Sequence, residues 1–246
     1  DYQRAFRVFR EAGVDRSMAI ALQDIGLVYV EAKDFDNALR YFDQSADAYS
    51  DDPILTLTMH NNRAEVLRMQ GKHEEASAEY EAALLQAREL ESDMLIARIL
   101  TNLAMSQTDE GELVRASANI RQAQQLSVGE GAAGWRPFVF GVSAKIALQR
   151  GQLGVAANRI GETFAGQDLT STDLLFREYH EIAARIYERV GRNDLALAHF
   201  KAFQRLDADA QESTSSTASQ LMGARFDFAN QNLKIANLEK GQLERD

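Results

Sequence analysis

A short pattern recurs five times along this chain of 246 residues, and it restricts the possible folds more than any other feature. Each copy has a marker alanine, a small residue twelve positions before it and a bulky residue four positions after it. The markers are Ala38, Ala76, Ala116, Ala156 and Ala196, so the spacing is 38 residues once and 40 residues thereafter. The small residues are Gly26, Ala64, Ala104, Ala144 and Ala184, and the bulky residues are Phe42, Tyr80, Ile120, Ile160 and Phe200.

A turn signal lies at a fixed place in the same pattern. Glycine stands five positions before four of the markers, and Lys33 takes that place in the first copy; the glycines are Gly71, Gly111, Gly151 and Gly191. Glycine commonly ends a helix in the left-handed conformation. Small residues at two fixed positions allow two antiparallel helices to approach closely, and bulky residues fill the remaining space. A period of this length is typical of a solenoid, whose units bury their apolar faces on their neighbours.

We therefore expect an all-α protein, a right-handed α-solenoid of antiparallel helix pairs with a long C-terminal helix. No alternating strand pattern is present, and there are only 2 prolines. Residues 1–13 read as the second helix of a truncated leading repeat. Residues 207–219 are small and polar, which predicts a loop or a frayed helix start, and 207–246 form a linker and a terminal helix. The five expected repeats are about 17–52, 53–91, 92–129, 135–167 and 172–206.

This pattern resembles the tetratricopeptide repeat (TPR). The first unit carries Leu22, Ile25, Gly26, Tyr29, Phe35, Ala38 and Phe42 at the family's signature positions, with Pro53 after the second helix. The fifth unit carries Ala184, Tyr187, Gly191, Ala196 and Phe200. The period exceeds the usual 34 residues, and Ser143 and Ala147 replace expected large residues in the fourth unit. The resemblance implies a protein-binding or peptide-binding module.

Composition argues against several classes of partner. The net charge is −10, from 27 Lys and Arg against 37 Asp and Glu, which disfavours nucleic acid and anionic membranes. The absence of cysteine excludes disulfides and thiolate metal sites. No stretch is apolar enough to span a bilayer, so we expect no direct membrane insertion of this segment. Because the chain starts at Asp1, we expect a fragment of a longer protein.

The sequence contains no motif for catalysis, a metal or a cofactor. His60 and His180 occupy equivalent interior positions in units two and five, too far apart in a solenoid to share a metal, and packing is the favoured interpretation. His73 and His199 are the other histidines. No nucleophile–base set, phosphate-binding loop or zinc-binding helix motif occurs, so we expect a non-catalytic protein without cofactors.

The candidate ligand groove lies on the first helices of successive units. The repeat register places Asn62 and Asn102 at equivalent positions, with Asn61 and Arg98 close by. Asparagine offers both donors and an acceptor, so it can hold a peptide backbone, and an arginine can bind a carboxylate with two hydrogen bonds. The TPR resemblance implies the same role for Arg98 and Asn62, because members that bind peptide C-termini use a basic residue and an asparagine there. The alternative is that Asn62 and Asn102 bond neighbouring helices.

A further part of the expected groove is charged. Lys145 and Arg185 repeat the position of Glu65 in later units, and they would add positive charge to the groove. Asp24, Glu65 and Glu181 oppose them, so no stripe of a single sign is expected.

Heptad spacing marks the last helix. Leu221, Phe228 and Ile235 recur every seven residues, and Leu238 lies on a second seam beside them. This spacing predicts a dimer seam of the coiled-coil type. The alternative is a helix that caps the final repeat and shields it from solvent.

The terminal segment carries a second resemblance. Repeats followed by residues 224–239, ARFDFANQNLKIANLE, resemble the sensor region of bacterial signalling proteins that carry a GGDEF diguanylate cyclase or histidine kinase domain. This resemblance implies a sensor on the periplasmic side of the inner membrane, with peptide or protein bound in the groove and a homodimer through the last helix. The alternatives are a cytoplasmic location, a stand-alone adaptor and a regulator that senses a peptide pheromone.

Overall fold

The computed structural model describes residues 15–243, and the side chains of residues 15–224 and Phe226. Within that range the chain forms ten α-helices, two 3₁₀ turns and no strand. The expected all-α class is confirmed. The α-helices are α2 (Asp15–Glu31), α3 (Phe35–Ala48), α4 (Pro53–Met69), α5 (His73–Glu89), α6 (Asp93–Glu110), α7 (Leu113–Leu126), α8 (Arg136–Gln149), α9 (Leu153–Thr163), α10 (Arg177–Arg189) and α11 (Asn193–Leu243); the 3₁₀ turns are η1 (Glu130–Trp135) and η2 (Leu174–Phe176).

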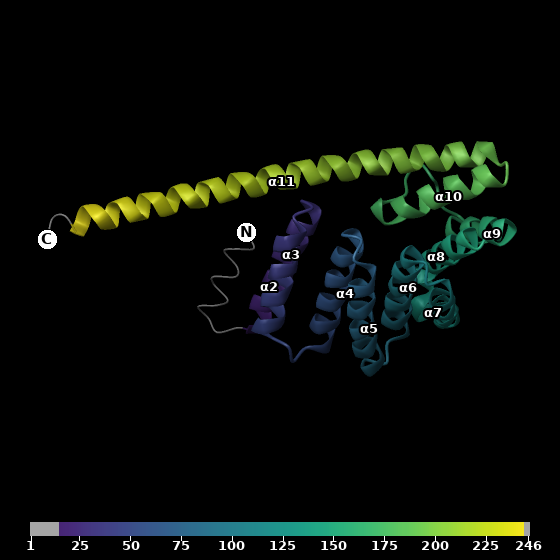
Figure 1. Ribbon diagram of the computed structural model, residues 1–246, viewed down its shortest axis with the longest axis horizontal. Helices are drawn as coiled ribbons and strands as arrows, with labels where there is room; N and C mark the ends of the chain where they lie inside the picture. Colours follow the sequence, from purple (N-terminus) through teal and green to yellow (C-terminus); the bar gives the residue numbers. More distant parts are fainter. Residues whose placement is uncertain (1–14, 244–246) are drawn as a thin grey trace.

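Consecutive helices form antiparallel pairs, and the pairs follow one another as a solenoid (Figure 1). The tight turns inside the pairs explain the glycine pattern. Gly111 ends α6 with a φ of 90°, and Gly71, Gly151 and Gly191 also have positive φ. Lys33 adopts a φ of 56° at the corresponding turn of the first pair. The backbone therefore requires a left-handed residue there, and glycine meets that requirement without steric strain.

Helix starts follow local sequence signals. Asp52 caps α4, because its side chain accepts hydrogen bonds from the backbone N–H groups of Ile54 and Leu55, and Pro53 occupies the first turn. Ser92 caps α6 in the same way through Leu95. Such caps satisfy backbone donors that have no partner within the helix. No helix among residues 15–243 is long and apolar enough to cross a bilayer.

The repeated residues form the core. The marker alanines of the first four pairs are fully buried, and so are Phe42, Tyr80 and Ile160 among the bulky residues. The second helix of each of the first four pairs packs against the first helix of the next pair. In the first pair, for example, Phe42 shares a cluster with Met59 and Val66 of α4. Burial of one large apolar side chain contributes about 1.5–3 kcal/mol, so stability accumulates along the row of pairs.

Helix α11 corrects two predictions from the sequence. The loop expected at 207–219 is wrong, because α11 is continuous for 51 residues. Residues 207–219 contain neither glycine nor proline. Side chains hold the beginning of this segment in place, because the Asp207 carboxylate pairs with Arg177 of α10 and accepts a hydrogen bond from Gln211 one turn later. The expected capping helix is also not a separate element within the described residues, because α11 is an extended second helix of the last pair.

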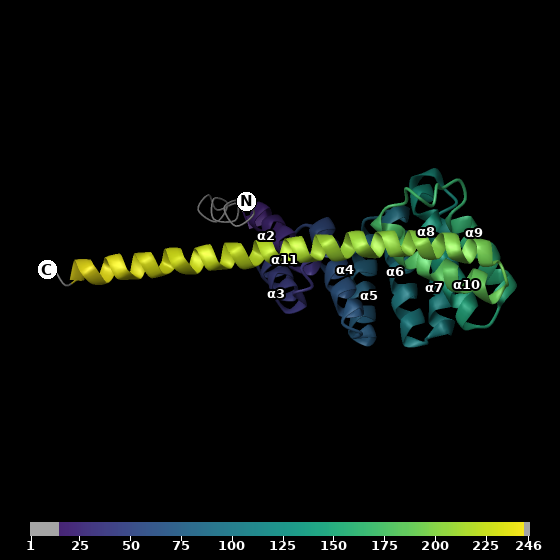
Figure 2. The same cartoon turned by 90° about the horizontal axis from the view of Figure 1, so that it is seen from above.

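The long helix returns across the array. Seen from above, α11 crosses over the earlier pairs and passes the first one (Figure 2). It contacts α2, where the Ser213 hydroxyl donates to the Glu31 carboxylate. Half-buried Leu221 packs against the cluster that contains Ile25 and Phe42. One helix therefore touches both the last and the first pair.

The close approach of α8 and α10 provides a test of the packing. A Cβ atom at Gly141 would lie 2.1 Å from Cδ1 of the Tyr179 ring. We expect Gly141→Ala to lower the free energy of unfolding by about 1–3 kcal/mol, because buried Tyr179 must shift. Urea denaturation measures the change. The control is Gly154→Ala on α9, where no atom lies within 4 Å of the added carbon; an equal loss in both variants would contradict the packing argument.

Candidate functional site

A cavity of about 440 Å³, which we call the groove cavity, opens on the first helices, where α4, α6, α8 and α10 meet η1 and η2. Its wall is mixed. Asn61, Asn102 and Glu178 supply polar groups, while Trp135 and Leu175 supply apolar surface. The predicted groove residues Asn61 and Asn102 line this cavity, whereas Asn62, Arg98 and Lys145 are not part of its lining.

The two lining asparagines contact each other. The Asn102 side-chain N–H donates to the Asn61 oxygen at 3.0 Å, and the Asn61 N–H donates to the Asn62 oxygen at 3.4 Å. The bond from Asn102 to Asn61 therefore joins α6 to α4, whereas Asn62 is bonded only within its own helix α4 in the hydrogen bonds described. A carboxamide has two donor hydrogens and an acceptor oxygen, so Asn102 retains the capacity to bind a further partner at the cavity surface.

Arg98 lies one helical turn before Asn102 on α6. Its Nε is buried and makes no hydrogen bond, and no carboxylate in the described part of the chain forms an ion pair with it. Burial lowers the pKa of its guanidinium. A buried donor without a partner carries a desolvation cost, which an incoming acceptor would relieve.

Charged residues connect four first helices beside the cavity. Arg68 on α4 pairs with Asp109 on α6 at 3.1 Å and with Glu178 on α10 at 3.3 Å. Lys145 on α8 pairs with the same two carboxylates, at 2.6 and 2.9 Å. Glu65 completes the group by pairing with Arg68 at 2.9 Å. We call these five residues the ionic network. The positive charge that Lys145 was expected to bring to the groove is therefore compensated.

The surroundings of Glu178 shift the pKa of its carboxyl group. Burial favours protonated Glu178, but the opposite charges of Arg68 and Lys145 outweigh burial and lower its pKa. Burial also raises the pKa of Tyr80 well above its ordinary value, and its hydroxyl donates to Glu65 at 2.9 Å. Three carboxylates face two cations, so the network carries one net negative charge. Sequence reasoning missed Arg68, Asp109 and Glu178 as a group, because Arg68 and Glu178 are 110 residues apart.

The histidines have structural surroundings. His60 contacts Glu79 at 2.7 Å, and fully buried His180 contacts His199 at 2.9 Å through their Nδ1 atoms. The other nitrogen of His180 contacts the Thr172 hydroxyl at 2.8 Å. Across the described residues, no group of three or more His, Cys, Asp or Glu is arranged to hold a metal.

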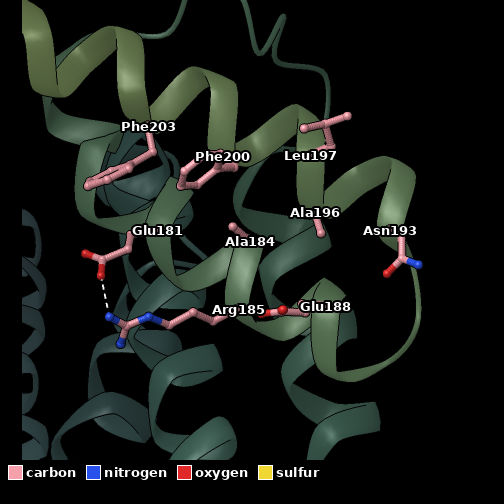
Figure 3. A pocket seen from close by; sticks show the side chains of 9 residues that line it. All are labelled: Glu181, Ala184, Arg185, Glu188, Asn193, Ala196, Leu197, Phe200 and Phe203. Carbon is pink, nitrogen blue, oxygen red and sulfur yellow. Dashed lines mark hydrogen bonds and ion pairs between the residues drawn. The ribbon is translucent and has the colours of Figure 1, made fainter.

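A second cavity, of about 500 Å³, lies at the end of the array between α10 and α11 (Figure 3). Phe200 and Phe203 project from α11 above it, and Glu181 and Arg185 of α10 lie below, paired at 2.5 Å. We call this cavity the end pocket. The repeat pattern places Phe200 at a packing position, yet the structure leaves it 46% exposed.

The predicted dimer seam is described only in part. Leu221 packs on the first pair. Phe228, Ile235 and Leu238 belong to the backbone of α11, but their side chains lie outside the described residues.

Comparison with known proteins agrees with the fold. Residues 55–127 match the tetratricopeptide repeat family. No curated protein matched the chain in sequence. BtubC (BKLC) from P. vanneervenii has a TM-score of 0.61 at 16% identity, with 85% of this chain and 88% of that chain covered.

Two longer proteins share the fold. The Rap conjugation gene regulator of plasmid pLS20, solved with the Phr* peptide, has a TM-score of 0.67 at 12% identity, and covers 83% of this chain. The APC/C hetero-tetramer Cut9-Hcn1 has a TM-score of 0.64 at 15% identity, and covers 89%. The matched regions span 57% and 39% of those chains.

Residues 55–127 are therefore similar to the TPR class, and the described helices form an all-α solenoid like that of BtubC. Repeats of this class are generally non-catalytic, and the matches indicate no catalytic family.

The buried histidine pair predicts a loss of stability in acid. The pKa of His180 is lowered from 6.5 to about 4, mainly by burial and then by the charges of His199 and Arg205. Burial likewise lowers the pKa of His199 to about 4. Between pH 6.5 and 4 the unfolded chain therefore binds protons that the folded chain does not. The contribution of the two neutral histidines to the free energy of unfolding is complete above pH 6.5. It declines as the pH falls toward 4, by up to about 1.4 kcal/mol per pH unit for each histidine.

Urea unfolding at pH 7 and pH 5 measures this loss. The His199→Phe variant keeps an aromatic ring beside Phe164 and Tyr187 but cannot be protonated, so we expect a smaller difference between the two pH values. The same difference in the variant and the parent protein would assign the acid sensitivity to other groups.

Proposed function

We propose that this protein binds an extended peptide, or an extended segment of a protein, in the groove of the first helices. The observation that carries the proposal is the mixed wall of the groove cavity. The amides of Asn61 and Asn102 lie on it together with Leu174 and Leu175, and Leu175 is 63% exposed. An extended chain needs both kinds of surface, because its backbone requires hydrogen bonds and its apolar side chains require burial.

Each part of the site has a role in this proposal. Asn102 binds a backbone amide of the ligand with the capacity that its bond to Asn61 leaves free. Arg98, whose buried Nε lacks a partner, binds a carboxylate or a backbone carbonyl. The leucines of η2 and Trp135 receive an apolar side chain. The Rap regulator supports the proposal by its fold, because that solenoid was solved with a bound peptide.

We further propose that groove occupancy is passed to a region that follows α11. The resemblance of residues 224–239 to bacterial sensors motivates this role, and it favours the periplasmic side of the inner membrane. Helix α11 begins in the last pair and contacts the first pair through Ser213 and Leu221, so a change in the array alters the position of the helix.

Peptide selection tests the groove. We expect 12-residue peptides selected from a random library to bind the protein, and Leu175→Asp to weaken them at least tenfold, because a charge would enter the apolar wall. Asn102→Ala should weaken them by about 0.5–1.5 kcal/mol, the value of one hydrogen bond, and Arg98→Ala by more. Isothermal titration calorimetry gives the dissociation constants.

Leu85→Asp is the matched control, since Leu85 is an exposed leucine on the second helix α5. It should leave the selected peptides bound. Peptides that bind the parent and all three groove variants equally would refute the groove. An Asn102→Ala variant that melts at a much lower temperature and still binds would show that the amide pair is purely structural.

The heptad seam predicts weak pairing of two chains through α11. Phe228 and Ile235 continue the seven-residue spacing beyond Leu221, which packs on the first pair, and such a stripe can meet an identical stripe after slight supercoiling. Glycines at 223 and 241 weaken the helix by about 1 kcal/mol each, so we expect dimers only at high concentration. Light scattering over a concentration series should show them, and Ile235→Asp should abolish them; dimers that persist in the variant would place the interface elsewhere.

A further inference from the structure

The end pocket forms at the repeat position four residues after the marker alanine, which is buried in the first four pairs and exposed in the fifth. Phe42, Tyr80, Ile120 and Ile160 hold the position four residues after the marker alanine and are at most 4% exposed, whereas Phe200 holds it in the last pair and is 46% exposed. Its neighbour Leu197 is also exposed. The last pair therefore presents an apolar face that the other pairs bury.

A following helix accounts for the difference. Ile160 of α9 belongs to the same buried cluster as Ile182 and Ile186, which the next first helix, α10, contributes. The corresponding neighbour of the last pair is absent from the described residues, because α11 packs against α10 and then continues without a turn across the array, so no further first helix follows it there. In the earlier pairs this place is taken by the first helix of the next pair.

The residues that line the rim of the end pocket restrict which ligands can bind in the pocket. Small Ala184 and Ala196 line the pocket together with Phe200, and they permit close approach of a helix backbone. Of the charged rim residues, Arg185 is paired with Glu181, and Glu188 forms no ion pair within the described part of the chain. The rim therefore carries one net negative charge and favours a basic partner.

We propose that the end pocket binds one amphipathic α-helix of a partner protein, with an apolar stripe against Leu197 and Phe200 and a lysine or arginine beside Glu188. This surface lies at the end of the array and shares no lining residue with the groove cavity. It is therefore a second interaction site, and it does not depend on the proposed peptide function.

Charge distinguishes this occupant from a second copy of the chain. Two identical end pockets facing each other would oppose two rims of the same net sign, on chains whose net charge is −10. A basic helix instead gains attraction on approach. Helix-in-groove binding also matches how the array itself is built, since every earlier pair accepts a helix at this position.

The test uses a displayed library of 18-residue peptides with apolar residues at helical spacing and random residues on both flanks. We expect selected peptides to be rich in lysine and arginine on the flanks. Leu197→Asp and Phe200→Asp should each weaken binding at least tenfold in fluorescence anisotropy, and Glu188→Lys severalfold. Both apolar residues are exposed, so circular dichroism should show that the variants remain folded.

Two controls separate this surface from others. Val114→Asp places the same charge at an exposed valine on α7, and Leu175→Asp alters the groove cavity; neither should affect the selected helices. Peptides without basic flanks, or binding that is unchanged in Leu197→Asp and Phe200→Asp, would overturn the proposal. A dimer of the parent protein that Leu197→Asp dissociates, but Ile235→Asp does not, would overturn it as well, because a second copy would then fill the pocket.

Discussion

The structure depends on the close contact between each helix pair and the first helix that follows it. Marker alanines such as Ala76 allow that helix to approach, and large residues such as Tyr80 fill the space beside it, with no exposed surface at either position. A single pair cannot bury its own apolar face, so stability comes from nearest neighbours along the row. The glycine turns follow from the same constraint, because only a tight left-handed turn returns the second helix against the first.

The ionic network adds a polar constraint to this apolar scheme. Arg68 contacts three carboxylates: Glu65 on its own helix α4, Asp109 on the next first helix α6, and Glu178 on α10. Charges that lose part of their hydration require good partners, and removal of one partner from a buried pair typically costs about 3–5 kcal/mol. The network therefore ties α4, α6, α8 and α10 together beside the groove cavity.

Local and periodic features could be predicted from the sequence, and long-range ones could not. The repeat register placed Asn102 near Asn61, because residues about 40 positions apart lie on adjacent first helices. The pairing of Arg68 with Glu178 depends on the curvature of the array, for which the sequence has no local signal. Phe200 was placed at a packing position, but its burial requires a neighbour that the repeat pattern alone does not supply.

The predicted loop at 207–219 failed for a related reason. Serine, threonine and aspartate cost at most about 0.7 kcal/mol each in a helix relative to alanine, and residues 207–219 contain no glycine or proline to break a helix. The continuity of α11 through residues 207–219 also has a consequence for the tertiary structure. From Asn193 to Leu221 the helix rises about 42 Å at 1.5 Å per residue, and it rests on Leu221 and Ser213 at the far pair. A helix that is anchored in the last pair and packed on the first would lose the contacts of Leu221 and Ser213 if the pitch of the array changed. The geometry of all five pairs therefore bears on these two contacts.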